Sequence, residues 1–146
     1  MDRFESGELI KGLSVLRDVV YDDKFGRRLT ALKRAVTLVE RQPDLKWWRT
    51  WVRDTVLEAD VALRLSRQQL LALIRLYDDP LTGLREIVPM FVGQPFTQPL
   101  AILLQVLDSF ASDRSSEVRN YCLSTVEQVG LLDDPVLKIA VKHLRN

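Results

Sequence analysis

The sequence predicts an all-α fold, and three observations favour it. Leucine is the commonest residue and charged residues make up 28% of the chain, a composition typical of helical proteins. Apolar residues recur at spacings of three and four, the period of an amphipathic helix. Alternating Val/Ile/Thr/Tyr runs closed by Asn-Gly or Asp-Gly turns are absent, so no hairpin is predicted. We therefore expect either a compact bundle of about eight helices or a short stack of helical hairpins.

Length and cysteine content predict one domain in a reducing compartment. The 146 residues are enough to bury roughly 68–70% of the surface of the unfolded chain, so we expect a single helical domain over 1–146, possibly excised from a longer protein. Cys122 is the only cysteine, which excludes an internal disulfide and favours the cytosol or nucleus. The first eight residues lack the pattern of a secretory signal. Apolar runs fall far short of the roughly 18 residues of a membrane span, so we expect a soluble protein.

Three helices are expected in the first 65 residues. The first spans 7–21, the second 27–42 and the third 45–63, where Pro43 ends the second helix and Asp44 caps the third. In the third helix Trp48 shares a face with the other apolar residues, so it is predicted to lie in the core. Trp47 and Trp51 project from an adjoining face.

Capping residues and prolines predict the helix boundaries in residues 66–99. Ser66 and Gln69 form a capping box before a leucine-rich helix, and Asp79 with Pro80 opens the next one. Pro89 is expected to kink or end that helix, with residues 90–99 as an apolar loop.

Three further helices are expected between residue 98 and the C-terminus. A helix over 98–111 is followed by one over 116–129, capped by Asp113 or Ser115 and ended by Gly130 in the αL conformation. Asp134 and Pro135 open the last helix. Its predicted inward residues are Val136, Ile139, Ala140 and Leu144.

An Asp-Asp pair recurs at three helix junctions. Tyr21-Asp22-Asp23, Tyr77-Asp78-Asp79 and Leu132-Asp133-Asp134 are separated by 56 and 55 residues. Two interpretations stay open. The pairs mark two three-helix units in tandem, or they reflect only the preference for aspartate at helix starts.

Residues 98–132 resemble a HEAT repeat. The segment Pro99-Leu100-Ala101-Ile102-Leu103-Leu104-Gln105-Val106-Leu107 is similar to the first helix of such a repeat. Asp113-Arg114-Ser115-Ser116 resembles its turn, and Glu117-Val118-Arg119 resembles the Val-Arg that begins its second helix. The resemblance implies stacked helical hairpins that bind protein partners along a curved face. It covers about a quarter of the chain.

The sequence does not favour an enzyme. His143 is the only histidine and lies in a basic segment, with no second histidine or further cysteine to complete a nucleophilic pair or a metal site. Cys122 occurs at the spacing of a buried helical face. The sequence contains no glycine-rich motif of the kind that binds phosphate groups. We therefore predict no catalytic, cofactor-binding or metal-binding residues.

The strongest functional signal is a basic stretch from Lys24 to Arg53. It contains nine basic residues and two acidic ones, a local charge of +7 in a chain whose net charge is +1, and all three tryptophans lie near its end. At 100° per residue, the seven-residue spacing of three of its arginines places them in one row away from the apolar face. The predicted partner-binding residues are Arg27, Arg34, Arg41, Trp47, Arg49, Trp51 and Arg53.

Several partners suit this stretch. We prefer another protein, bound through the basic face and the tryptophans by an adaptor, a regulatory subunit or a viral accessory protein. The alternative is nucleic acid, held at its phosphates by Arg27, Arg28, Lys33, Arg34, Arg41, Lys46, Arg49 and Arg53. An anionic membrane surface also suits the pattern. Self-association through the tryptophans or through residues 90–96 is a further possibility that suits the pattern. A structural interpretation stays open as well, in which the basic helices pair with acidic ones of the same fold.

Overall fold

A computed structural model describes residues 25–58, 61–93 and 97–145, together with positions 11, 13, 14 and 17. These residues form seven α-helices and one short 3-10 helix, and no strand occurs among them, which confirms the all-α prediction. Most of the helix expected over 7–21 lies outside the described residues, so the count of eight stays a prediction. The chain separates into two compact units, residues 1–65 and 66–146.

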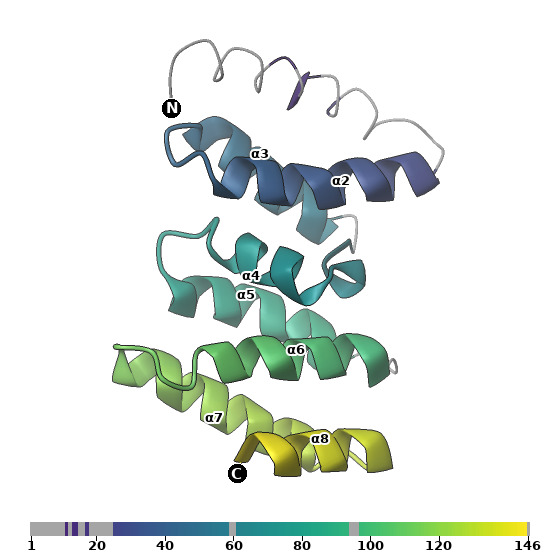
Figure 1. The fold of residues 1–146 in the computed structure, drawn as a ribbon, viewed down its shortest axis with the longest axis vertical. Helices are drawn as coiled ribbons and strands as arrows, with labels where there is room; N and C mark the ends of the chain where they lie inside the picture. Colours follow the sequence, from purple (N-terminus) through teal and green to yellow (C-terminus); the bar gives the residue numbers. More distant parts are fainter. Residues whose placement is uncertain are drawn as a thin grey trace. The chain divides into compact units, whose positions relative to one another are not determined.

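Unit 1 is built on a helical hairpin (Figure 1). Helix α2 (Phe25–Glu40) packs on α3 (Lys46–Glu58), and the 3-10 helix η1 (Val61–Arg64) contacts both. Fully buried side chains at helical spacing line the contact, namely Leu32, Val36 and Val39 from α2 and Val52 and Val56 from α3. Trp48 is buried with them, as predicted. The expected helix over 45–63 is too long, because its last turn is the separate η1.

Unit 2 contains five helices that pack on one another in the order of the chain (Figure 1). Each helix contacts the next one and the next but one along the chain. This order places α4, α6 and α8 in one layer and α5 and α7 in the other. The bounds are α4 Arg67–Ile74, α5 Pro80–Val92, α6 Thr97–Ser109, α7 Ser116–Gly130 and α8 Pro135–Arg145.

The capping signals of unit 2 are confirmed at four helix starts. Ser66 Oγ accepts a hydrogen bond from the Gln69 N–H at 3.2 Å, and the Gln69 side chain accepts one from the Ser66 N–H at 3.0 Å. Asp79 Oδ1 accepts from the Thr82 N–H at 2.8 Å, before Pro80 in the first turn of α5. Ser115 caps α7 and Asp134 caps α8 in the same way. These bonds satisfy backbone donors that have no partner within the helix.

Two predicted helix ends are wrong. Helix α5 continues through Pro89 to Val92, so residues 90–92 are helical and not part of a loop. The ring of Pro89 is exposed, while Ile87 and Phe91 are buried on the other side of the helix, and this burial offsets the lost backbone hydrogen bond. Gly130 is the last residue of α7 and not an αL cap, because the helix ends at Leu131 in the αR conformation.

The predicted inward face of α8 is wrong for Val136 and Ile139, whereas Ala140 and Leu144 are half-buried and Leu144 lines an apolar pocket with residues of α6 and α7. Leu137 and Val141 are buried, whereas Val136 is 62% exposed and Ile139 is 70% exposed. The helix carries apolar residues on two faces, and the sequence pattern alone does not state which face meets α6 and α7. Within the described residues, no helix combines the length and apolar character needed to cross a membrane.

Candidate protein-interaction surface

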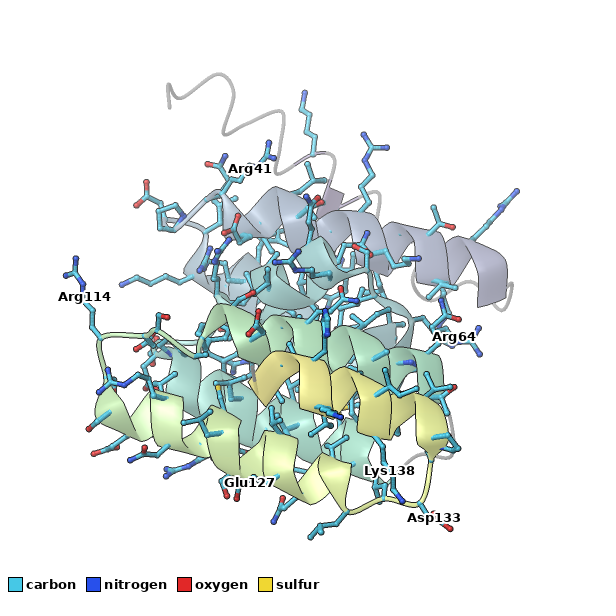
Figure 2. All side chains as sticks on the ribbon, turned by 60° about the horizontal axis from the view of Figure 1, so that its bottom comes forward. Arg41, Arg64, Arg114, Glu127, Asp133 and Lys138 are labelled. Atoms are coloured by element: carbon cyan, nitrogen blue, oxygen red, sulfur yellow. The ribbon has the colours of Figure 1, made fainter. Side chains whose placement is uncertain are left out.

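The row of arginines on α2 has the geometry expected from the sequence. Arg27, Arg34 and Arg41, which we call the basic ridge, are all exposed. The fully buried Leu32, Val36 and Val39 of α2 point well away from the ridge, whereas Ala31, which lies on the ridge side of the helix, is also buried. Arg41 follows the end of α2 and lies at the edge of unit 1 (Figure 2). Arg27 and Arg34, seven residues apart within α2, are thus separated by about 10.5 Å along the helix axis.

The tryptophans of α3 form a connected cluster. Trp48 is buried, and its ring meets Trp47 edge-on at a centroid distance of 4.8 Å and Trp51 at 5.8 Å. The Arg17 guanidinium lies 5.8 Å from the centroid of the Trp48 ring, within the range of a cation–π interaction. Trp51 is half-buried, whereas Trp47 is 59% exposed. Trp47 is thus the exposed end of the cluster, and its contact with the buried Trp48 fixes its position.

Arg49 connects the two helices of unit 1. Its Nη1 donates hydrogen bonds to the carbonyl oxygens of Val39 at 2.7 Å and Glu40 at 3.0 Å, the last residues of α2. Helix α2 has no basic residue of its own in its last turn, so Arg49 supplies the positive charge that stabilises a helix C-terminus. This structural role was not predicted from the sequence, which placed Arg49 only among the partner-binding residues.

The remaining basic residues differ in exposure. Arg53 is half-buried and pairs with its neighbour Asp54 at 3.1 Å. Lys46 is exposed, whereas Lys33 and Arg28 are half-buried, and the Nε of Arg28 is buried without a hydrogen-bond partner. The eight residues predicted to bind nucleic acid therefore differ in exposure. The exposed arginines among them are those of the basic ridge.

The single histidine and the single cysteine lie in different settings. No three His, Cys, Asp or Glu side chains among the described residues come together as a possible metal site. His143 is exposed, and Cys122 is buried. Burial raises the pKa of the Cys122 thiol to about 11, which disfavours the reactive thiolate. Cys122 lines an apolar pocket in unit 2 with a volume of about 30 Å³, little more than the room needed by a water molecule.

A second surface was missed in the sequence. Leu131 is 85% exposed in the turn between α7 and α8, and Val136 and Ile139 of α8 are exposed as well. In the same turn, Asp133 pairs with Lys138 at 3.4 Å (Figure 2). The available signal was the presence of two apolar faces on α8, of which the prediction took Val136 and Ile139 as inward and left out Leu137 and Val141.

Comparisons with family models, with curated proteins and with solved structures find no match to this chain.

Proposed function

We propose that unit 1 binds another protein through Trp47 and the basic ridge, as an adaptor or regulatory subunit would. The observation that carries this proposal is the exposure of Trp47, 59%, on top of the buried Trp48. Exposed tryptophans are common among the residues that dominate the free energy of protein binding. The edge-to-face contact with Trp48 restricts the Trp47 ring before binding, which lowers the entropy lost when a partner immobilises it.

The charge of the basic ridge indicates an acidic partner surface. Exposed arginines attract carboxylates over about the Debye length, so they accelerate association more than they strengthen the complex. We therefore assign affinity chiefly to Trp47 and speed of association chiefly to Arg27, Arg34 and Arg41. Trp51, Arg49 and Arg53 are half-buried, and we propose that they support this surface from its border.

Nucleic acid is the second candidate, and the charges make it the weaker one. Residues 1–65 contain 13 basic and 11 acidic residues, a net charge of only +2, whereas nucleic-acid-binding domains are usually strongly basic. Arg49 and Arg53 already have acceptors within unit 1. Because these two arginines already bond within unit 1, fewer basic side chains are available to bind phosphates than the local charge of +7 implies.

We also propose a HEAT-like architecture for α4–α8. The support is the contact order of unit 2, in which consecutive helices alternate between two layers. At the turn that resembles a HEAT turn, the Arg119 guanidinium donates to the Asp113 carbonyl, and Asp113 Oδ1 accepts from the Ser115 N–H at 2.9 Å. These bonds join the turn to the first part of α7, as a hairpin of a helical stack requires.

Affinity capture from the native cells with the full chain tests the proposed function. We expect one protein to co-purify with the wild type, to be lost with Trp47→Ala, and to associate more slowly with the triple variant Arg27→Glu, Arg34→Glu, Arg41→Glu. Gln105→Ala, at an exposed position of α6, is the control for an unrelated surface. Co-elution of a mixed-sequence oligonucleotide at low salt, with a steep loss as salt is added, would favour the nucleic-acid candidate instead.

A further inference from the structure

The turn between α2 and α3 presents a tryptophan together with two cations. We call residues 41–47, which join the two helices and include the start of α3, the hairpin tip. Arg41, Lys46 and Trp47 of this segment are all exposed. Neither Arg41 nor Lys46 forms an ion pair with any residue that the structure describes. The hairpin tip therefore combines one large apolar side chain with two cations that have no acidic partner in the described part of the fold.

Contacts within unit 1 hold the hairpin tip in place. The Gln42 N–H donates a hydrogen bond to the Val39 carbonyl oxygen at 3.0 Å, and the Leu45 N–H donates one to the Gln42 carbonyl oxygen at 3.1 Å. The buried Trp48 meets the indole of Trp47 edge-on at a centroid distance of 4.8 Å. Because these contacts are present without a partner, little conformational entropy is lost when a partner binds the hairpin tip.

Trp47 protrudes from unit 1 and does not line a groove. It contacts Trp48 on one side and stays 59% exposed. Side chains that dominate the free energy of protein binding are usually enclosed in well-packed pockets from which water is excluded. A protruding indole reaches such an environment only if the partner supplies the pocket. The partner surface beside that pocket must carry negative charge, because unlike charges across an interface favour association with Arg41 and Lys46.

We propose that the partner of unit 1 receives Trp47 in an apolar pocket and places Asp or Glu carboxylates opposite Arg41 and Lys46. This inference rests on the proposed function and adds the form of the partner surface, which is that of a folded protein with an acidic rim around a pocket. It also assigns Lys46 to the protein interface, whereas the sequence analysis placed Lys46 only among the residues for nucleic acid. Asp44, the only acidic residue of the hairpin tip, repels the same carboxylates.

Zero-length crosslinking tests the acidic rim. The protein that forms an adduct with a photoreactive residue at position 47 is purified, mixed with the full chain and treated with a carbodiimide, which joins an amine directly to a carboxylate. We expect an amide between Lys46 Nζ and an Asp or Glu of that protein. Lys46→Arg keeps the charge but cannot form the amide, so it is expected to bind and to lose the crosslink. Lys138→Arg, at an exposed position of unit 2, is the matched control and should keep it.

Truncation at position 47 tests the pocket. The loss of one methylene group from a side chain enclosed in an apolar pocket weakens binding about 10- to 200-fold, so we expect Trp47→Phe to weaken the complex with the purified protein at least about tenfold. On a flat contact, phenylalanine would replace tryptophan with little loss. The sign of the partner charge is tested by association rates, which should fall for Lys46→Gln and rise for Asp44→Asn.

The outcomes distinguish this inference from the proposed function. A protein adduct at position 47 without the Lys46 amide, or with full affinity in Trp47→Phe, leaves the proposed function in place and overturns the pocket with its acidic rim. The absence of any protein adduct at position 47 overturns both. A nuclease-sensitive adduct also overturns both, because nucleic acid contains no carboxylate that could form the amide.

Discussion

The guanidinium of Arg49, in the first turn of α3, donates a 2.7 Å hydrogen bond to the carbonyl oxygen of Val39 in the last turn of α2. The two helices that carry the candidate surface are thus joined by a cation from one and the C-terminal carbonyls of the other. Because the basic ridge lies on α2 and just after its end, and the tryptophans are on α3, this bond helps to hold the two parts of the surface together.

Replacing Arg49 is expected to destabilise unit 1. Arg49→Ala removes a charged donor from two carbonyl oxygens, and hydrogen bonds of charged groups contribute about 1.5–3 kcal/mol. The half-exposed position favours the lower end of that range. Tryptophan fluorescence during urea unfolding measures the change in unit 1, because all three tryptophans lie there. Arg34→Ala, on the exposed ridge, should change stability by less than about 0.5 kcal/mol; an equal loss in both variants would contradict a specific role for Arg49.

Gly83 permits the close approach of α5 to the end of α4. A Cβ at this position would lie 3.0 Å from Tyr77 Cδ2 and 3.1 Å from the Ile74 carbonyl oxygen. Overpacking costs about 1–3 kcal/mol, and the better helix propensity of alanine returns about 1 kcal/mol. We therefore expect Gly83→Ala to destabilise unit 2 by about 1 kcal/mol, measured by hydrogen exchange in α4 and α5.

Gly93 provides the matched control for Gly83. It ends α5 with a φ of −84°, and a Cβ there meets nothing within 4 Å. Gly93→Ala is expected to leave the exchange rates of α4 and α5 unchanged. Faster exchange in the Gly93 variant, or unchanged exchange in the Gly83 variant, would show that the close contact with Tyr77 is not what requires glycine.

The cap of α5 makes stability depend on pH in the acid range. The backbone N–H and hydroxyl of Thr82 bond to the Asp79 carboxylate and hold its pKa below 3.8. A carboxyl whose pKa is lower in the folded state stabilises the fold above its unfolded pKa, and this stabilisation is lost as the pH falls through its folded pKa. Asp79→Asn keeps an acceptor at the cap, so we expect a smaller loss of stability below pH 3.8 than in the wild type.

Burial should protect the Cys122 thiol from modification. Its pKa is raised to about 11, so native Cys122 is expected to react with a thiol reagent only as fast as α6, α7 and α8 open, and rapidly in urea. The unfolded thiol ionises nearer pH 9.0, so its contribution to stability is present below that pH and declines toward pH 11. Rapid labelling of the folded chain at neutral pH would contradict the burial.

Local signals predicted the helix starts of unit 2 because capping depends on neighbouring residues. Ser66, Asp79 and Asp134 each bond to a backbone N–H three residues on, so the geometry is contained in the sequence pattern. The predictions that failed concern features that tertiary contacts determine. Pro89 is tolerated within α5 because Phe91 is buried beyond it, and the sequence around the proline does not report that burial.

The candidate surface was predictable in part. Helical periodicity correctly placed the basic ridge on an exposed face and Trp48 in the core. It did not reveal that Arg49 caps α2, because this bond joins residues of two helices. It also chose Ile139 over Leu137 for the inward face of α8, because both residues are apolar and only packing against α6 and α7 distinguishes them.

The most direct test of the proposed function is site-specific photo-crosslinking from position 47 of the full chain in its native cells. A photoreactive aromatic residue replaces Trp47, and the same residue at exposed position 105 of unit 2 is the control. We expect one discrete protein adduct from position 47 that resists nuclease treatment, is absent from position 105, and weakens in the Arg27→Glu, Arg34→Glu, Arg41→Glu background. A nuclease-sensitive adduct, or the same adducts from both positions, would contradict the assignment of this surface to a protein partner.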